Sequence, residues 1–202
     1  MRQRLVPIAV TVALCGCAGP RVAVAPAAGV SDERRFVDSV LATMTLEEKL
    51  GQLNQLTASD YAASPESLAA LIGRGGVGSL MDVVGADTTR ALQRIAVERS
   101  RRRVPLLFAD DVIHGLRTVF PIPLAEASSW DPALAERTAR VAATEAAANG
   151  LTWTYAPMVD VARDPRWGRV MEGAGEDPFL GAAFAAARVR GFQGTNLRAP
   201  DA

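Results

Sequence analysis

The sequence predicts an α/β fold in which helices cover a parallel sheet: either the N-terminal part of a (β/α)8 TIM barrel or a doubly wound sheet. Short apolar runs at residues 76–81, 105–109 and 151–159 are typical of strands buried on both faces. Segments with helical periodicity lie between these runs, so helix and strand alternate along the chain. No Gly-x-Gly-x-x-Gly motif follows a run, so a dinucleotide-binding fold has no support.

Helices are predicted from their start and stop signals. Thr45 and Glu48 form a capping box, and Leu46, Leu50 and Leu53 fall on one face of the helix that follows. The expected caps of the later helices are Asp87, Asp131 and Asp177, and the expected ends are Asn149-Gly150 and Gly191. Because a complete barrel needs roughly 250 residues, residues 31–202 are expected to supply an incomplete one.

The charge balance argues against several kinds of partner. The chain has 202 residues, and its 22 Lys and Arg balance 22 Asp and Glu. No block of like charge indicates binding to nucleic acid or to an anionic membrane surface. The densest basic stretch, Arg99 with residues 101–103, falls at the end of a predicted helix, where cations interact well with the helix dipole. We interpret this stretch as structural.

Residues 1–17 are predicted to be a signal peptide. Arg2 and Arg4 precede an apolar stretch at residues 5–14, which is too short to span a bilayer. Residues 14–17, Leu-Cys-Gly-Cys, resemble a bacterial lipobox with Cys17 as the lipidated residue. An ordinary cleaved signal with incidental cysteines is the alternative. Residues 18–30, rich in Ala, Val and Pro, are predicted to be a tether. We therefore expect a periplasmic protein, held at the outer membrane by its lipid anchor alone.

Cysteine and histidine usage narrows the chemistry. No cysteine follows Cys17, so the mature domain has neither a disulfide framework nor a thiolate metal site. His114 is the only histidine, whereas a metal site normally needs three or four ligands. The sequence also lacks a Gly-x-Ser-x-Gly motif, and a nucleophilic triad has little support. We expect no metal and no cofactor.

Two predicted strands are followed by unusually polar segments. The first segment contains Asp110, Asp111, His114 and Arg117, and the second contains Asp160, Arg163, Asp164, Arg166, Arg169, Glu172, Glu176 and Asp177. Functional residues of barrels gather at the carboxyl ends of strands. Carboxylates accept from adjacent hydroxyls and arginine donates a fork of hydrogen bonds, which suits a ligand covered in hydroxyl groups. Trp130, Trp153 and Trp167 are candidates for stacking on a sugar ring. The alternatives are salt bridges that lock loops, and core packing of the tryptophans.

Several sequence blocks, in order, resemble glycoside hydrolase family 3. They are residues 45–53 (TLEEKLGQL), 104–118 (VPLLFADDVIHGLRT), 120–124 (FPIPL), 127–132 (ASSWDP), 153–169 (WTYAPMVDVARDPRWGR), 172–173 (EG) and 175–178 (GEDP). The resemblance covers about residues 32–194. It favours the first-domain barrel of the family over a doubly wound sheet.

The resemblance implies an exo-acting, retaining β-glycosidase of the β-glucosidase type, acting on terminal non-reducing β-D-glucosyl residues of a β-glucoside or oligosaccharide. It implies that Asp111, Arg117 and Arg169 bind the terminal sugar and that His114 supports them. Glu172 and Glu176 are expected to orient the loop that bears Arg169, and Asp160 and Asp164 to form rim structure. Residues 114–117 differ from the acidic residue and Gly-Gly-Arg typical of the family's β-N-acetylhexosaminidases, which favours glucosidase. β-Xylosidase stays open.

The family's nucleophile, an aspartate on a later strand, and its acid/base from the next domain have no counterpart up to Ala202. The family's Lys-His pair, which follows the segment matching residues 191–194, is also not reached. Since retaining hydrolysis needs two carboxyl groups about 5–5.5 Å apart, we expect no turnover from this chain alone. Open strand edges predict poor stability. The alternative is a non-catalytic sugar-binding or interaction module derived from a degraded barrel. A third alternative, an unrelated barrel that binds a phosphate ligand, ranks low because the sequence has no glycine-rich phosphate-binding loop.

Overall fold

The computed structural model describes residues 30–57, 59, 65–194 and 196. The predicted signal peptide, Cys17 and nearly all of the tether lie outside this part of the chain. The chain divides into two units, Met1–Ser39 and Val40–Ala202. Helix α1 (Val30–Thr43) begins in the first unit, and the strands of the described residues belong to the second. No helix in the described part of the chain has the length and apolarity needed to span a bilayer.

Four parallel strands form the sheet of the second unit. They are β1 (Gln55–Thr57), β2 (Ser79–Met81), β3 (Leu107–Asp110) and β4 (Trp153–Thr154), paired in this order. Helix α4 (Pro65–Gly73) follows β1, α5 (Ala86–Arg99) follows β2, α6 (Pro123–Ala127) and α7 (Pro132–Ala148) follow β3, and α8 (Pro178–Gln193) follows β4. The predicted α/β fold is confirmed. Because the strand order never reverses, these strands lack the switch point of a doubly wound sheet and match a barrel.

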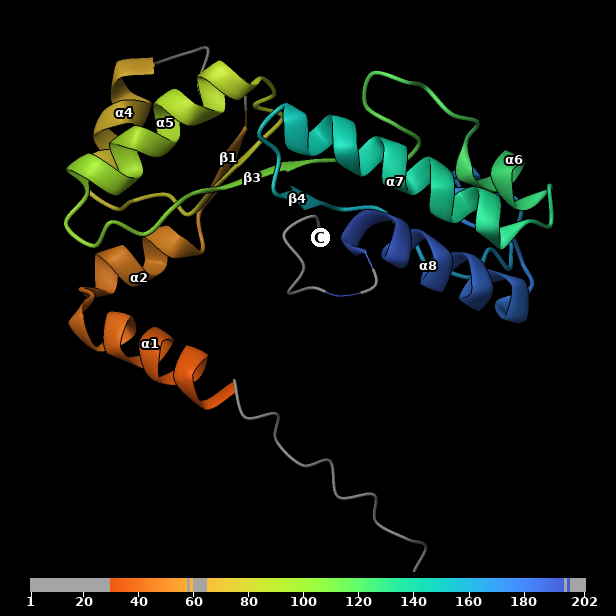
Figure 1. Ribbon diagram of the computed structural model, residues 1–202, viewed down its shortest axis with the longest axis horizontal. Coiled ribbons are helices and arrows are strands. Elements are labelled where there is room, and N and C mark those ends of the chain that lie inside the picture. The colour runs from red at the N-terminus through yellow and green to blue at the C-terminus, as the bar shows by residue number, and fades with distance from the viewer. Residues whose placement is uncertain (1–29, 58, 60–64, 195, 197–202) are drawn as a thin grey trace, which may run out of the picture. The chain divides into compact units, whose positions relative to one another are not determined.

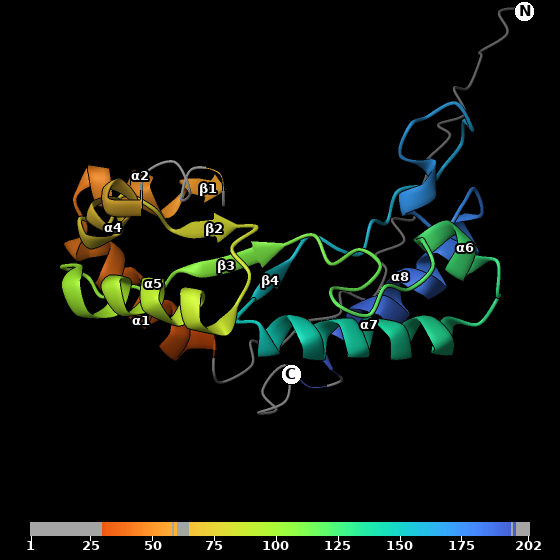
Figure 2. The same cartoon turned by 90° about the horizontal axis from the view of Figure 1, so that it is seen from above.

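The sheet is curved, as a barrel requires. Tyr155, just after β4, donates a hydrogen bond from its hydroxyl to Oε1 of Gln55 on β1 (2.9 Å). In a flat sheet, strands three places apart lie about 14 Å from each other, and their side chains stand roughly perpendicular to the sheet. A direct hydrogen bond between such side chains therefore indicates that the sheet bends β1 and β4 toward each other. Figures 1 and 2 show α4 and α5 beside the strands, with α6, α7 and α8 on the side toward which β2 and β3 point.

One face of the sheet carries the core. Leu80 and Phe108, both nearly inaccessible to solvent, belong to a cluster with residues of α4, α5 and α7. On the opposite face, Leu107 is 50% exposed and Trp153 is 41% exposed. The prediction of strands buried on both faces is therefore wrong for Leu107 of β3, although Ala109 on the same face is buried.

The strand predictions held in part. Residues 76–81 contain β2, and residues 105–109 contain β3 except for its last residue, Asp110, but residues 151–159 contain only the two-residue β4. The Thr154 hydroxyl accepts from the backbone N–H groups of Val112 and Ala156, and the next residue, Pro157, has no N–H to donate. Pairing ends there for this reason. Strand β1 and helices α1, α4 and α6 were not predicted. Strand β1 and helix α6 have only three and five residues, too few to show a period, and α1 begins in the segment assigned to the tether.

The predicted capping box is confirmed. The Glu48 backbone donates to Thr45 Oγ1 (3.2 Å), and the Thr45 backbone donates to Glu48 Oε2 (2.9 Å), at the start of α2 (Leu46–Gln52). Glu48 also accepts two hydrogen bonds from Arg101 and lies 3.8 Å from Arg102. The basic stretch is thus structural in these two residues. The expected apolar face of α2 is exposed instead, with Leu46, Leu50 and Leu53 at 67%, 58% and 84%.

The other helix ends agree with the sequence signals at three of five positions. Asp131 caps α7 through the Leu134 backbone N–H, and α7 ends at Ala148, before Asn149. Asp177 caps α8. Two predictions were wrong by two residues. Helix α5 has Gly85 as its N-cap in place of Asp87, and α8 passes Gly191 to end at Gln193.

Gly191 does not stop α8 because its role is close packing. A Cβ at this position would lie 2.5 Å from the Ala139 Cβ of α7, so only glycine lets the two helices approach there. The chain leaves the helix instead at Gly194, which has a φ of 75°.

Gly51→Ala is expected to lower the free energy of unfolding by about 1–3 kcal/mol. A Cβ at Gly51 would lie 2.0 Å from the carbonyl oxygen of Gly75, so α2 must move away from the turn before β2. Gly181→Ala in α8 is the control, because its Cβ meets no atom within 4 Å. It is expected to stabilise by about 0.5–1 kcal/mol. Urea denaturation of both variants checks this; equal effects would contradict it.

Candidate functional site

Three carboxylates gather where β2 and β3 end. Asp82 directly follows β2, Asp110 is the last residue of β3, and Asp111 follows it. The register pairs Met81 with Ala109, and the Asp82 backbone donates to the Ala109 carbonyl (3.0 Å). Asp82 therefore lies beside Asp110. Asp82 was not predicted as a site residue, although the strand-end rule applied to residues 76–81 would have indicated it.

These neighbours change the acidity of Asp110. Burial is the largest cause that raises the pKa of Asp110, and the charges of Asp82 and Asp111 and a hydrogen bond with the Asp82 side chain raise it further. A hydrogen bond from the Asp111 backbone to Asp110 Oδ1 (2.7 Å) opposes the increase in pKa. The protonated form of Asp110 is thus favoured more than in an exposed aspartate.

Asp111 is electrostatically coupled to the segment after β4. Its pKa is raised by burial first and then by the charge of Glu172, whereas Arg169 and His114 lower it. In the described part of the chain, no side chain donates a hydrogen bond to the Asp111 carboxylate. Its oxygens are therefore open to donors from a ligand.

Arg169 is fixed by Glu172. The Arg169 Nε lies 2.9 and 3.0 Å from the two Glu172 oxygens, and Nη2 lies 2.6 Å from Oε2. This fork lowers the pKa of Glu172 and raises that of Arg169. The geometry agrees with the expected orienting role of Glu172. Glu176 is exposed, and its carboxylate makes no hydrogen bond or ion pair with any described residue.

Arg117 is placed differently from Arg169. Its Nη2 lies 3.4 Å from Oδ1 of Asn149, at the end of α7, and its backbone N–H donates to Glu145. The structure thus brings Asp111, Arg169, Glu172 and His114 within electrostatic range, while the Arg117 guanidinium lies against α7. Sequence reasoning missed Glu145, because its partners lie 27 and 28 residues away along the chain.

A buried ion pair supports the loop after β3. Arg188 of α8 donates from Nη1 to Glu126 Oε2 of α6 (2.7 Å) and from Nη2 to the carbonyl of Ile113. The two charged side chains are only 8% and 3% exposed. Glu126 also accepts from the Thr138 hydroxyl of α7. This network links helices α6, α7 and α8 to Ile113, the residue before His114.

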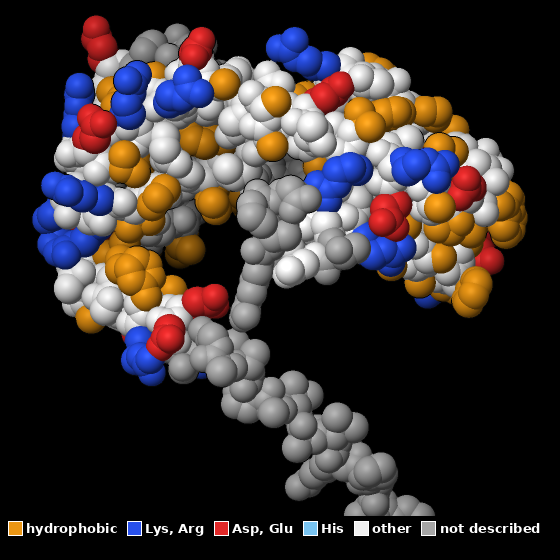
Figure 3. Space-filling model, viewed as in Figure 1, with side chains coloured by type: hydrophobic (Ala, Val, Ile, Leu, Met, Phe, Trp, Pro, Cys, Tyr) orange, Lys and Arg blue, Asp and Glu red, His pale blue; other side chains and the backbone are white. Residues whose placement is uncertain are grey.

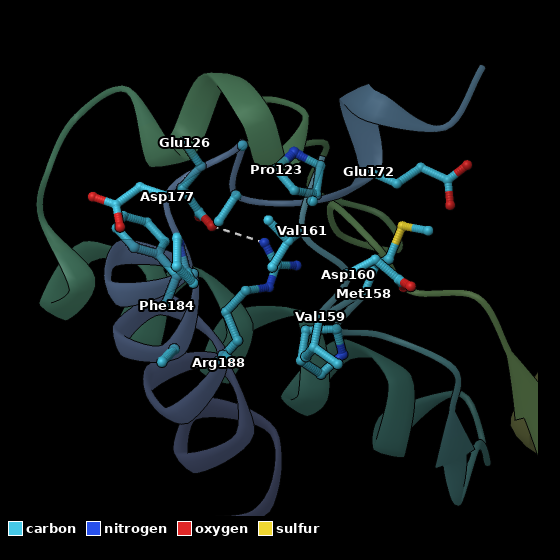
Figure 4. A pocket seen from close by; sticks show the side chains of 18 residues that line it. Pro123, Glu126, Met158, Val159, Asp160, Val161, Glu172, Asp177, Phe184 and Arg188 are labelled. Atoms are coloured by element: carbon cyan, nitrogen blue, oxygen red, sulfur yellow. Dashed lines mark hydrogen bonds and ion pairs between the residues drawn. The ribbon is translucent and has the colours of Figure 1, made fainter. Parts of the chain in front are cut away.

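Figure 4 shows Arg188 between Glu126 and the segment that carries Met158 and Asp160, inside a pocket of about 180 Å³. Glu172 lies at the far side of the same view. The Nε of Arg188 and the Nδ1 of His114 are buried without a hydrogen-bond partner among the described residues. Glu126 and Arg188 were not predicted as partners, since they lie 62 residues apart along the chain.

The three tryptophans are all partly exposed. Trp130, Trp153 and Trp167 are 71%, 41% and 38% exposed, so none is a core residue of this chain. Trp167 lies two residues before Arg169, in the segment that faces Asp111, whereas Trp130 lies between α6 and α7. Asp164, from the same segment, forms a fork with Arg166 at 2.6–3.2 Å. Figure 3 shows acidic and basic side chains mixed with apolar ones on the face it draws.

Comparisons with known proteins agree on one family. The model of the glycosyl hydrolase family 3 N-terminal domain matches residues 45–200. A periplasmic beta-glucosidase of Salmonella typhimurium is 43% identical over 159 residues, which cover 79% of this chain and 21% of the relative. A putative beta-xylosidase of Formosa agariphila is 32% identical over 177 residues, 78% of this chain and 23% of the relative.

A solved structure supports the same placement. The beta-glucosidase from Listeria innocua, crystallised with glucose, matches with a TM-score of 0.72 and 38% identity. The match covers 80% of this chain and 24% of the Listeria chain. This chain thus spans about a quarter or less of the length of these relatives.

Arg188→Met alone is expected to lower the free energy of unfolding by about 3–5 kcal/mol, because Glu126 loses the cation that compensates its burial. The double variant Glu126→Leu with Arg188→Met is expected to recover most of this loss, since apolar pairs often replace buried ion pairs at little cost. Urea denaturation measures both. A double variant no more stable than the single one would contradict this account.

Asp110→Asn is expected to raise stability near neutral pH and to change it little below the ordinary aspartate pKa of about 3.9. Because the folded-state pKa is raised, the folded chain holds this proton more tightly, and stability falls as pH rises through the folded-state pKa. Asn removes that loss. Asp164→Asn is the control of opposite sign, because Arg166 lowers the pKa of Asp164. Thermal melts at both pH values check it; a pH-independent gain would refute it.

Proposed function

The chain belongs to glycosyl hydrolase family 3, and from this membership we propose that it forms the sugar-binding part of an exo-acting, retaining β-glycosidase barrel. The proposed reaction removes terminal non-reducing β-D-glucosyl residues from β-glucosides or oligosaccharides. The names of the Salmonella and Listeria relatives support glucosidase activity, and the Formosa relative keeps β-xylosidase as the neighbouring alternative.

The observation that carries this proposal is the approach of Asp111 to Arg169 across the ends of β3 and β4. A carboxylate with no side-chain donor can accept hydrogen bonds from two adjacent sugar hydroxyls. Arg169 uses two of its five N–H groups on Glu172, so three remain for a ligand. Held by Glu172, this guanidinium loses little further freedom when it binds.

No residue of this chain is assigned as nucleophile or acid/base. Asp110 has a raised pKa, but it lies beside Asp82 at the end of the sheet and bonds the Asp111 backbone. We assign Asp110 to the support of Asp111, and His114, Glu172 and Glu176 to the support of the sugar subsite. The two catalytic carboxyl groups would come from other parts of the enzyme, so this chain alone is proposed to be inactive.

The proposed location is the periplasm. The relative from Salmonella is named as periplasmic, which supports export of this chain. Lipidation of Cys17 and anchoring at the outer membrane are part of the same proposal. They rest on the lipobox resemblance of residues 14–17.

Binding of D-glucose to the isotopically labelled 202-residue chain, followed by NMR titration, tests the proposed function. We propose Asp111, Arg117 and Arg169 as the residues that contact the sugar, with His114 beside them, and we expect shifts at all four. Asp111→Asn is expected to weaken binding by about tenfold or more, because hydrogen bonds to a charged group contribute about 1.5–3 kcal/mol. Asp164→Asn, in the same segment as Arg169, is the control and is expected to bind as the wild type does. The same samples are expected to release no p-nitrophenol from p-nitrophenyl β-D-glucoside.

Both the binding measurement and the activity measurement can contradict the proposed function. Failure of the wild-type chain to bind glucose, or equal loss of binding in both variants, would overturn the assignment of the sugar subsite. Turnover by the 202-residue chain would overturn its proposed inactivity.

A further inference from the structure

We propose that Glu145 of α7 is a positioning residue for sugar binding, which holds the loop of residues 112–118 in its binding conformation. This inference rests on the proposed function. Glu145 touches no residue assigned to catalysis and acts through the backbone of the loop. Neither the rule for strand ends nor the family resemblance predicts a role for Glu145.

Three hydrogen bonds converge on the Glu145 carboxylate. Its Oε2 accepts from the backbone N–H of Arg117 (2.8 Å) and from that of Thr118 (2.9 Å), and its Oε1 accepts from the Thr118 hydroxyl (2.6 Å). These bonds lower the pKa of Glu145, the Thr118 hydroxyl having the largest effect. Charge-assisted hydrogen bonds of this length are stronger than neutral ones. One side chain therefore fixes two consecutive residues of the loop.

The loop turns back on itself just before these two residues. Gly115 has a φ of 109°, and a Cβ there would lie 1.9 Å from the Thr118 carbonyl oxygen. The Phe120 backbone donates to the His114 carbonyl (2.8 Å), which closes the turn. The N–H groups of Arg117 and Thr118 would have no backbone acceptor inside this turn. Glu145 supplies that acceptor.

Helix α7, which carries Glu145, is itself held in place by packing against the core. Ala142 and Ala146, on either side of Glu145 in the helix, are buried in the core of the second unit. One turn further on, the carbonyl of Asn149 accepts from Gly85, three residues after Asp82. The end of α7 thus holds both the loop from β2 and the loop from β3, which begin with Asp82 and Asp111.

The loop is fixed at its start by a second contact. Val112 donates its backbone N–H to the Thr154 hydroxyl (3.3 Å), and Arg188 donates to the Ile113 carbonyl. The position of the Asp111 backbone is thus fixed by strand β3 on one side and by Val112 and Ile113 on the other. Arg117, six residues later, depends on Glu145. Loss of Glu145 is expected to affect the sugar contact of Arg117 more than that of Asp111.

Glucose titration of the full 202-residue chain separates this role from general stability. Glu145→Ala is expected to weaken glucose binding by about tenfold or more, since all three bonds are lost. Glu145→Gln keeps one acceptor oxygen for the two backbone N–H groups and is expected to bind within about threefold of the wild type. The control is Glu136→Ala on the same helix. It loses an ion pair with Arg190 (2.9 Å) but makes no contact with the loop, and it is expected to bind as the wild type does.

Hydrogen exchange gives a second measurement, which does not need a sugar. The amides of Arg117 and Thr118 are expected to be protected in the wild-type chain and to exchange at least about tenfold faster in Glu145→Gln, because a neutral oxygen is the weaker acceptor. Fast exchange of these amides in the wild type would overturn the inference, even if Glu145→Ala failed to fold.

The outcomes distinguish this inference from the proposed function. If the wild type binds glucose and Glu145→Ala binds equally well, the positioning role is refuted and the function stands. An equal loss in Glu145→Ala and Glu136→Ala would also refute it, because the effect would then follow α7 in general. If the wild type binds no glucose, the proposed function fails, and the role of Glu145 in sugar binding fails with it.

Discussion

The parallel pairing of β2, β3 and β4 determines where the carboxylates at the strand ends lie. Because the register places Met81 beside Ala109 and Ala109 beside Trp153, the three strands end at nearly the same level. The chain must then leave each strand toward the same region, and the residues that follow meet there. Carboxylates from two strands become neighbours in this way, and their repulsion adds to burial, the largest cause, in raising the pKa of Asp110.

The helices then hold the strand-end loops with charged side chains from far along the sequence. Arg188 of α8 holds the beginning of the loop after β3, and Glu145 of α7 holds its end. A buried ion pair such as Arg188 with Glu126 adds little net stability, because desolvation offsets its Coulomb energy. The ion pair contributes more to positioning than to stability, because the same guanidinium also donates to the Ile113 carbonyl and so fixes the position of that residue. Stability and positioning are therefore separable here, and the core around Leu80 and Phe108 supplies the former.

The features predictable from the sequence are those determined by neighbouring residues. The capping box of Thr45 and the N-cap of Asp131 involve atoms three residues apart, and both were confirmed. Asp111 and Arg169 lie within recognisable blocks, and the structure places them within electrostatic range. Gly191 misled the prediction of a helix end because a glycine needed for close packing and one needed for a stop look identical in sequence.

The residues missed are those whose partners are distant in sequence. Glu145 lies on an alanine-rich helix, and nothing beside it in sequence indicates that its carboxylate faces the turn at Gly115. Glu126 and Arg188 likewise appear in sequence as exposed helix charges, although both are buried. Pattern reasoning assigns charges to solvent unless a partner lies within one helical turn. It therefore fails where a tertiary contact supplies the partner.

The two arginines assigned to the sugar differ in what their movement would cost. Arg169 cannot leave Glu172 without separating a forked ion pair, whereas the guanidinium of Arg117 has one contact of 3.4 Å with a neutral amide. A bond of that length is weak, and the forked pair is much stronger. The Arg117 guanidinium can therefore move toward a ligand at a lower cost in free energy than that of Arg169, provided that the Arg117 backbone stays fixed. A fixed backbone with a loosely held side chain is the arrangement that Glu145 and Asn149 together produce.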